Sequence, residues 1–195
     1  TTSGKTIING IGMATSGGNL ENNGTIDLQG TGTATNIGVY LEKNTTSGTN
    51  PSGTLGANST VKVKGDNSTG VLVKNGTLNY GGDTTVEGNG VTGLIIGDNT
   101  TTNTAVVTAA KTGTVTVNNG TSTSAGIYSY TQGKSTVKKG SYGIVVGKNS
   151  KLVSSGTNNV NVDVNVTGDE SIGLYSGENA ELEVGNHTVK AYEGA

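Results

Sequence analysis

The sequence predicts an all-β protein, a right-handed parallel β-helix, or solenoid, of about seven coils. Composition is the first observation: the 195 residues include 34 Gly but one Pro and no Cys, Trp or Phe. Gly, Thr, Asn and Ser disfavour helices, whereas Val, Thr and Ile favour strands. The second observation is that the aliphatic residues recur in two motifs. Small aliphatic residues stacked coil upon coil would form the thin core that such a composition allows.

The first motif is a glycine followed by two or three mostly aliphatic residues, which predicts a strand that starts at a tight glycine corner. Successive glycines of this kind lie 17 to 33 residues apart, as expected for coils with loops of variable length. A weaker copy is Gly12-Met13-Ala14-Thr15. The clear copies are Gly38-Val39-Tyr40-Leu41, Gly70-Val71-Leu72-Val73, Gly93-Leu94-Ile95-Ile96, Gly126-Ile127-Tyr128-Ser129, Gly143-Ile144-Val145-Val146 and Gly173-Leu174-Tyr175-Ser176.

The second motif precedes the first and alternates between aliphatic and polar residues, which predicts a strand with one buried face. Its expected outward residues include Asp27, Lys62, Glu87, Thr116 and Lys138. The residues expected to point inward from both motifs are Ile26, Leu28, Val39, Leu41, Val61, Val63, Val71, Val73, Val86, Leu94, Ile96, Val115, Val117, Ile127, Val137, Ile144, Val146, Val164, Val166 and Leu174.

A polar corner follows the first motif and leads to a short third strand, such as Thr77-Leu78-Asn79 or Lys151-Leu152-Val153. Asn suits a corner because it tolerates the left-handed conformation and bonds its own backbone. Whether the corner residues also form a stacked ladder is open. They are Asn44, Asn99, Asn149 and Asn179, with Asn75 and Gln132 close by. The long segments 45–58 and 100–112 are expected to be loops that leave the coil.

No linker divides residues 1–195, so we expect a single solenoid segment. No capping helix is evident at either end, which favours a piece of a longer solenoid. The chain has a net charge of -2, with 12 Lys and no Arg. It therefore lacks the excess of basic residues that is typical of a nucleic-acid binder. With no Cys and a single His, His187, we expect no metal site and no cofactor.

The acidic residues argue against catalysis. Glycoside hydrolysis needs two carboxylates that face each other across a groove. Asp27, Glu87 and Asp163 are instead scattered over the outward positions of different coils. We therefore expect no enzyme, although a fragment of a β-helical polysaccharide lyase or glycosidase stays open as an alternative.

The recurring unit of Ser or Thr, any residue, Gly and aliphatic residues resembles the passenger domain of type V autotransporters. Examples are Ser68-Thr69-Gly70-Val71-Leu72-Val73 and Ser171-Ile172-Gly173-Leu174-Tyr175. The Lys-rich, Arg-free and Asn-rich composition is most similar to the large outer-membrane adhesins of fusobacteria. The resemblance implies a rod on the bacterial cell surface, whose parent protein is anchored by an outer-membrane barrel. It also implies attachment to a protein or glycan receptor on host cells or other bacteria. A purely structural spacer is the alternative.

An outward row between the inward positions is the candidate binding surface. Strand alternation turns its members outward, and stacked coils would align them in one apolar stripe. An exposed apolar stripe marks a contact site, unless the segments 45–58 and 100–112, or another part of the parent protein, fold over it. The row consists of Tyr40, Leu72, Ile95, Tyr128, Val145 and Tyr175.

Overall fold

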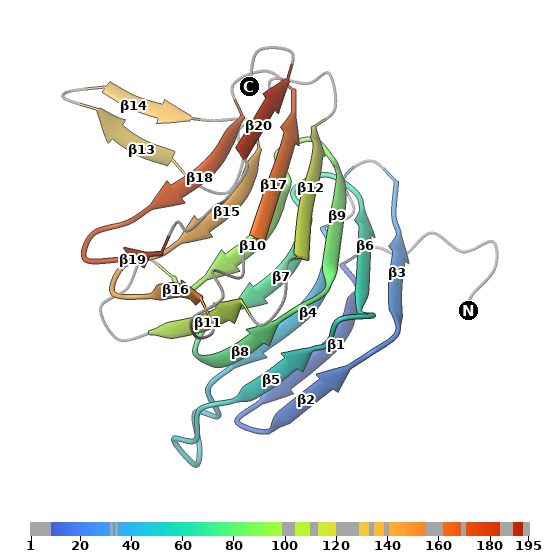
Figure 1. Cartoon of the computed structure of the whole chain (residues 1–195), viewed down its shortest axis with the longest axis vertical. Helices are drawn as coiled ribbons and strands as arrows, with labels where there is room; N and C mark the ends of the chain where they lie inside the picture. The colour runs from blue at the N-terminus through green and yellow to red at the C-terminus, as the bar shows by residue number, and fades with distance from the viewer. Residues whose placement is uncertain are drawn as a thin grey trace.

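The computed structural model describes residues 9–31, 33, 35–98, 104–109, 113–119, 129–132, 135–138, 141–154, 162–168, 171–183 and 189–192. All regular elements in these ranges are strands, and most of them stack as three parallel sheets around one core (Figure 1). The predicted all-β solenoid is therefore confirmed. Its right-handed winding stays a prediction.

Each coil contributes one strand to sheet A, one to sheet B and one to sheet C, in that order along the chain. Sheet A contains β1 (Ile11–Ser16), β4 (Ile37–Glu42), β7 (Thr69–Val73), β10 (Thr92–Ile96), β15 (Tyr142–Val146) and β18 (Ile172–Ser176). Sheet B contains β2 (Asn19–Asn22), β5 (Ser52–Leu55), β8 (Gly76–Tyr80), β11 (Ala105–Ala109), β16 (Lys151–Ser154) and β19 (Glu181–Leu182). Sheet C contains β3 (Thr25–Gln29), β6 (Thr60–Lys64), β9 (Asp83–Gly88), β12 (Gly113–Asn119), β17 (Val162–Thr167) and β20 (Val189–Tyr192).

The core lies inside the coils, and the predicted inward residues of sheets A and C fill it. Every predicted inward member in the described side chains is buried, except Leu174, which is partly buried against the core. Ile127 lies outside the described residues. Sheet B adds apolar side chains that the two motifs did not include, among them Leu55, Leu78 and Tyr80. Because each coil buries these groups only against its neighbours, stacking supplies the stability.

The glycine of the first motif lies inside the sheet A strand, not at a corner. A Cβ on Gly38 would lie 2.5 Å from the carbonyl oxygen of Gly70 and would overlap the side chain of Val61 on sheet C. The same two clashes recur at Gly70, Gly93 and Gly143. The motif therefore needs glycine because sheets A and C approach too closely for a side chain, not because of a turn conformation.

The coil predicted between β10 and β15 is not found in the described part of the chain. Strand β10 pairs directly with β15, and the chain between β12 and β15 instead carries an antiparallel hairpin of β13 (Ser129–Gln132) and β14 (Ser135–Lys138). The prediction that Val137 and Lys138 belong to an alternating strand of the solenoid is therefore wrong.

The length of the chain explains this difference. Gly126 and Gly143 are 17 residues apart, whereas the shortest complete coil, from Gly70 to Gly93, takes 23. No complete coil in the described part of the chain is as short as 17 residues. The described residues consequently complete six coils rather than about seven.

The two segments expected to leave the coil as loops each contain a strand of sheet B. Residues 45–58 include β5, and residues 100–112 include β11. The predicted third strands at Thr77-Leu78-Asn79 and Lys151-Leu152-Val153 are confirmed as parts of β8 and β16. Sheet B was missed in places because Gly53, Thr54 and Ala105 carry little apolar signal.

The Asn corners serve mainly local turn geometry. Asn149 and Asn179 adopt positive φ angles of 55° and 53°, and Asn44 Oδ1 accepts the backbone N–H groups of Thr46 and Ser47. Asn75 reaches the coil before it, where its Oδ1 accepts the N–H of Lys43 at 3.3 Å. Gln132 lies in β13, away from the coil corners, and Asn99 lies outside the described residues.

A polar ladder does exist, at the corner between sheets C and A. It consists of Asn36, Ser68, Ser141 and Ser171, each two residues before the motif glycine and each buried. Asn36 Oδ1 accepts the N–H of Gly10 at 2.8 Å, Ser68 Oγ that of Asn36 at 2.9 Å, and Ser141 Oγ that of Val91 at 3.1 Å. Asn36, Ser68 and Ser141 thus each satisfy a backbone donor of the preceding coil, which links these coils at a position where water is excluded.

Candidate functional site

The outward row of sheet A is a real row. Tyr40 is paired with Leu72, Leu72 with Ile95, Ile95 with Val145, and Val145 with Tyr175 across neighbouring parallel strands. Tyr128 lies outside the described residues, and Ala14 of β1 extends the row at the N-terminal end. Five of the six residues predicted for the outward row therefore lie side by side on successive strands.

The row is not uniformly exposed. Ile95 and Val145 are 3% and 0% exposed, although neither belongs to the core cluster inside the coils. The exposure expected for these two residues is therefore not found. Tyr40, Leu72 and Tyr175 are half-buried.

The C-terminal half of the row forms an apolar cluster with an aromatic pair. Tyr142 is fully buried but also lies outside the core cluster. Its ring centroid is 6.1 Å from that of Tyr175, with the ring planes at 84°, which is a favourable edge-to-face contact. Because Tyr142 and Val145 are fully buried, we call this part of the row its closed half.

The N-terminal half is open and forms a groove of about 260 Å³ across β4, β7 and β10. Tyr40, Leu72 and Ile95 of the row, together with Ile37 and Thr69, supply its strand positions. Thr35 and Asn67 lie where the chain enters sheet A, and Lys74, Gly97 and Asp98 where it leaves. The groove, which we call the sheet A groove, therefore has an apolar middle and two polar ends.

The hydroxyl group of Tyr40 is held in place. It donates a hydrogen bond of 2.6 Å to Glu42 Oε2, two residues further along β4. Burial, the hydrogen bond to Glu42 and the negative charges of Glu42 and Asp98 raise the pKa of Tyr40 to about 12. Tyr40 is therefore a neutral, oriented ring at neutral pH.

Sequence reasoning identified the apolar middle of the groove but missed its polar ends. The two sequence motifs do not include Thr35, Asn67, Lys74 or Asp98. These residues could have been found from their positions, because they lie next to the ends of the strands that contain the outward row. Strand ends in stacked coils align in the same way as the strands themselves.

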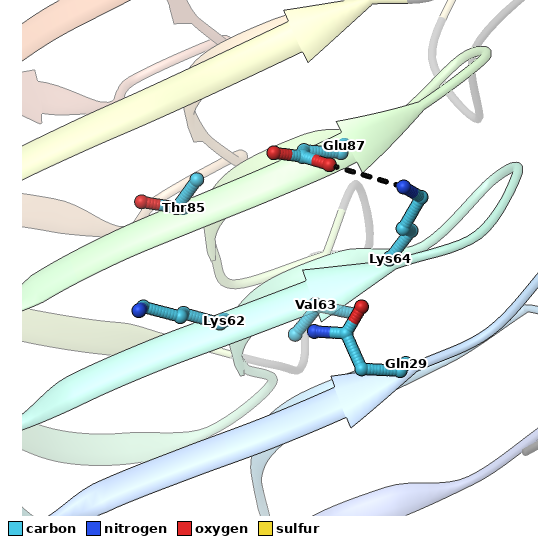
Figure 2. Close-up of a pocket in the computed structure, with 6 residues that line it drawn as sticks. All are labelled: Gln29, Lys62, Val63, Lys64, Thr85 and Glu87. Atoms are coloured by element: carbon cyan, nitrogen blue, oxygen red, sulfur yellow. Dashed lines mark ion pairs between the residues drawn. The ribbon is translucent and has the colours of Figure 1, made fainter. Parts of the chain in front are cut away.

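The outer face of sheet C has a second, polar depression of about 320 Å³. Figure 2 shows its residues on three neighbouring strands, with Lys62 and Lys64 on β6, Thr85 and Glu87 on β9, and Gln29 on β3. Lys64 Nζ lies 3.5 Å from Glu87 Oε2, and both side chains are about half exposed. An exposed pair of this kind contributes little energy. The depression has the character of a hydrated strand face.

The acidic residues weighed for catalysis lie apart. Asp27, Glu87 and Asp163 occupy β3, β9 and β17 of sheet C, and each of these strands is separated from the next by at least one other. Over the described ranges, no group of three or more His, Cys, Asp or Glu side chains could hold a metal ion. His187 lies outside these ranges.

No helix in the described part of the chain has the length and apolar character needed to cross a bilayer. Comparisons of the whole chain with protein-family models, with curated proteins and with solved structures give no match.

Proposed function

We propose that this chain is a rod-forming segment of a bacterial cell-surface adhesin, which attaches to host cells or to other bacteria through the outer face of sheet A. The observation that supports this proposal most directly is the sheet A groove. It presents Tyr40 and Leu72, two half-buried apolar side chains, at a face that a pure spacer would gain nothing by leaving open.

Two further features agree with the proposal. The motif with Ser or Thr before the glycine resembles autotransporter passenger domains, and stacked coils give the extended shape that a surface rod needs. Anchorage of the parent protein at the outer membrane belongs to the same proposal and rests on the same resemblance.

The spacer alternative also has an observation in its favour. Ile95 and Val145 are covered, so two of the five described members of the row do not offer a free surface. Under this alternative, the groove would be a gap in the packing and not a contact site.

Binding of the isolated chain to cells separates the two functions. Beads coated with the 195-residue chain would be added to epithelial cells and to a panel of oral and intestinal bacteria. We expect attachment that Tyr40→Ser combined with Leu72→Ser lowers at least five-fold. The matched control is Lys62→Ser combined with Lys64→Ser on sheet C, which should leave attachment unchanged. No attachment, or equal attachment of both variants, would refute binding through sheet A, provided that circular dichroism shows all variants folded.

A further inference from the structure

The chemistry of the sheet A groove narrows the class of ligand. We infer that it binds one neutral hexopyranose ring of a surface glycan, with the ring lying against Tyr40 and Leu72 and its hydroxyl groups reaching the polar ends of the groove. This inference rests on the proposed function and adds the ligand class to it.

Size is the first argument. Pockets for drug-sized molecules start at roughly 300 Å³, and the groove encloses about 260 Å³. The groove is thus suited to one compact unit rather than to a folded partner or an extended chain.

The arrangement of polar and apolar groups is the second argument. A pyranose has an apolar C–H face and a rim of hydroxyl groups that both donate and accept hydrogen bonds. The groove matches this pattern, because Leu72 and the Tyr40 ring lie between two polar ends. Asn67 offers an amide donor and acceptor at one end, and Lys74 and Asp98 offer charged groups at the other.

The backbone argues against a peptide. Extended peptides bind sheets by adding to an open edge. Strand β7, in the middle of the groove, is paired with β4 on one side and with β10 on the other. A peptide in the groove would find no free backbone groups on that strand, whereas a sugar needs only side chains.

Charge argues against an acidic sugar. Glu42 lies beside Tyr40 on β4 and Asp98 is close enough to raise the pKa of Tyr40, while Lys74 is the single cation among the groove residues. With two carboxylates against one ammonium group, an anionic sugar would meet net repulsion. A neutral ring avoids this repulsion, and its hydroxyl groups can donate a strong hydrogen bond to the carboxylate of Asp98 at the end of the groove.

The test measures binding of free sugars to the full chain by saturation-transfer NMR and by calorimetry. The neutral probes are methyl β-D-glucopyranoside, methyl β-D-galactopyranoside and N-acetylglucosamine, and the acidic probe is N-acetylneuraminic acid. We expect at least one neutral probe to bind with a Kd in the millimolar range, as is normal for so small a ligand. The acidic probe should bind at least ten-fold more weakly.

Variants locate the site. Tyr40→Ala should lower the affinity for the neutral probe at least ten-fold. Tyr40→Phe keeps the stacking face and should lower the affinity two- to five-fold. Tyr175→Ala is the matched control, because Tyr175 occupies the same row but packs against Tyr142 in the closed half. It should leave sugar binding unchanged.

The outcomes separate this inference from the proposed function. Attachment to cells that depends on Tyr40 and Leu72, with no binding of any neutral sugar, overturns the sugar inference alone. Equal binding of neutral and acidic sugars, or loss of binding through Tyr175→Ala but not through Tyr40→Ala, also overturns it. Absence of both cell attachment and sugar binding overturns the inference and the proposed function together.

Discussion

The outer faces of sheets A and C differ in chemistry although their backbones are built alike. On both sheets, parallel strands from successive coils are paired in register, and alternate residues point inward to the same core. On sheet A the outward row is apolar, with Leu72 and Ile95 in its middle. On sheet C the outward residues at comparable coils are Lys62 and Thr85.

The difference shows which positions the fold constrains. The inward positions of all three sheets carry mainly apolar side chains, because they fill one shared core. The outward positions are free of this requirement, so a row of apolar outward residues on one sheet only is not a by-product of coiling. The outward row of sheet A itself has two different halves. Tyr142 and Val145 are buried in one half, whereas the sheet A groove exposes part of Tyr40 and Leu72 in the other.

The largest expected effect tests the inward and outward sides of a single strand. Val63 is buried in the core, whereas its neighbour Lys62 is exposed. Val63→Asp leaves a carboxylate among aliphatic side chains and should lower the free energy of unfolding by roughly 3–5 kcal/mol, or abolish folding. Lys62→Asp should change it by less than about 0.5 kcal/mol. Urea unfolding followed by circular dichroism measures both, and similar losses would show that the alternation on β6 is misassigned.

The next effect tests the close approach of sheets A and C. A Cβ on Gly93 would lie 2.6 Å from the carbonyl oxygen of Gly143 and would overlap Val115. Gly93→Ala should therefore destabilise the protein by about 1–3 kcal/mol, as overpacking does. At Gly24 the nearest atom to a new Cβ is 3.9 Å away, so Gly24→Ala is the matched control and should be nearly neutral. A harmless Gly93→Ala would mean that the two sheets are further apart than described.

A third effect concerns the polar ladder at the corner between sheets C and A. Ser68→Ala removes the acceptor of the buried Asn36 N–H, which should cost roughly 1–2 kcal/mol. Ser47→Ala is the control, because the exposed Ser47 hydroxyl bonds only within its own turn, to Thr49. Thermal unfolding of the two variants should differ clearly. Equal melting temperatures would show that the ladder does not stabilise the stack.

The sequence was sufficient to predict the inward side of sheets A and C. Period-two alternation and a repeated glycine fix which residues of each strand face the core, so Val61, Val63 and Leu94 could be assigned inward without a structure. The same pattern fixed the outward row, because the residues between two inward positions must point away from the core.

What the sequence could not predict depends on contacts between distant segments. The burial of Ile95 and Val145 depends on what packs over sheet A, which no local pattern encodes. The sequence predicts a coil in place of the β13–β14 hairpin because Gly126-Ile127-Tyr128 copies the motif, although the next motif glycine, Gly143, follows after only 17 residues. The polar ends of the groove could not be predicted because Asn and Asp, the residue types at positions 67 and 98, are also common in ordinary turns.

The smallest effect compares a tyrosine outside the core with one inside it. Tyr40 lies on the outer face of sheet A, and its pKa is raised to about 12, mainly by burial and then by its hydrogen bond to Glu42. Tyr80 is fully buried in the core, where burial raises its pKa further, although its hydrogen bond to Thr84 opposes the shift. For both residues the fold favours the neutral phenol. Their contribution to stability is therefore complete below pH 10, the ordinary pKa, and is lost as the pH rises through the folded pKa. For Tyr40 the loss falls between about pH 10 and 12 and is small, because water screens a half-buried group.

Tyrosinate absorbance measured during an alkaline titration tests this comparison. Tyr40→Phe should remove one group that ionises near pH 12 while the strands, followed by circular dichroism, are still intact. Tyr80→Phe should remove a group that ionises only together with unfolding, since the phenolate cannot form inside the stacked coils. If Tyr40→Phe instead removed a group that titrates near pH 10, the ring would be freely solvated. The sheet A groove would then lack the fixed wall on which a ligand is expected to lie.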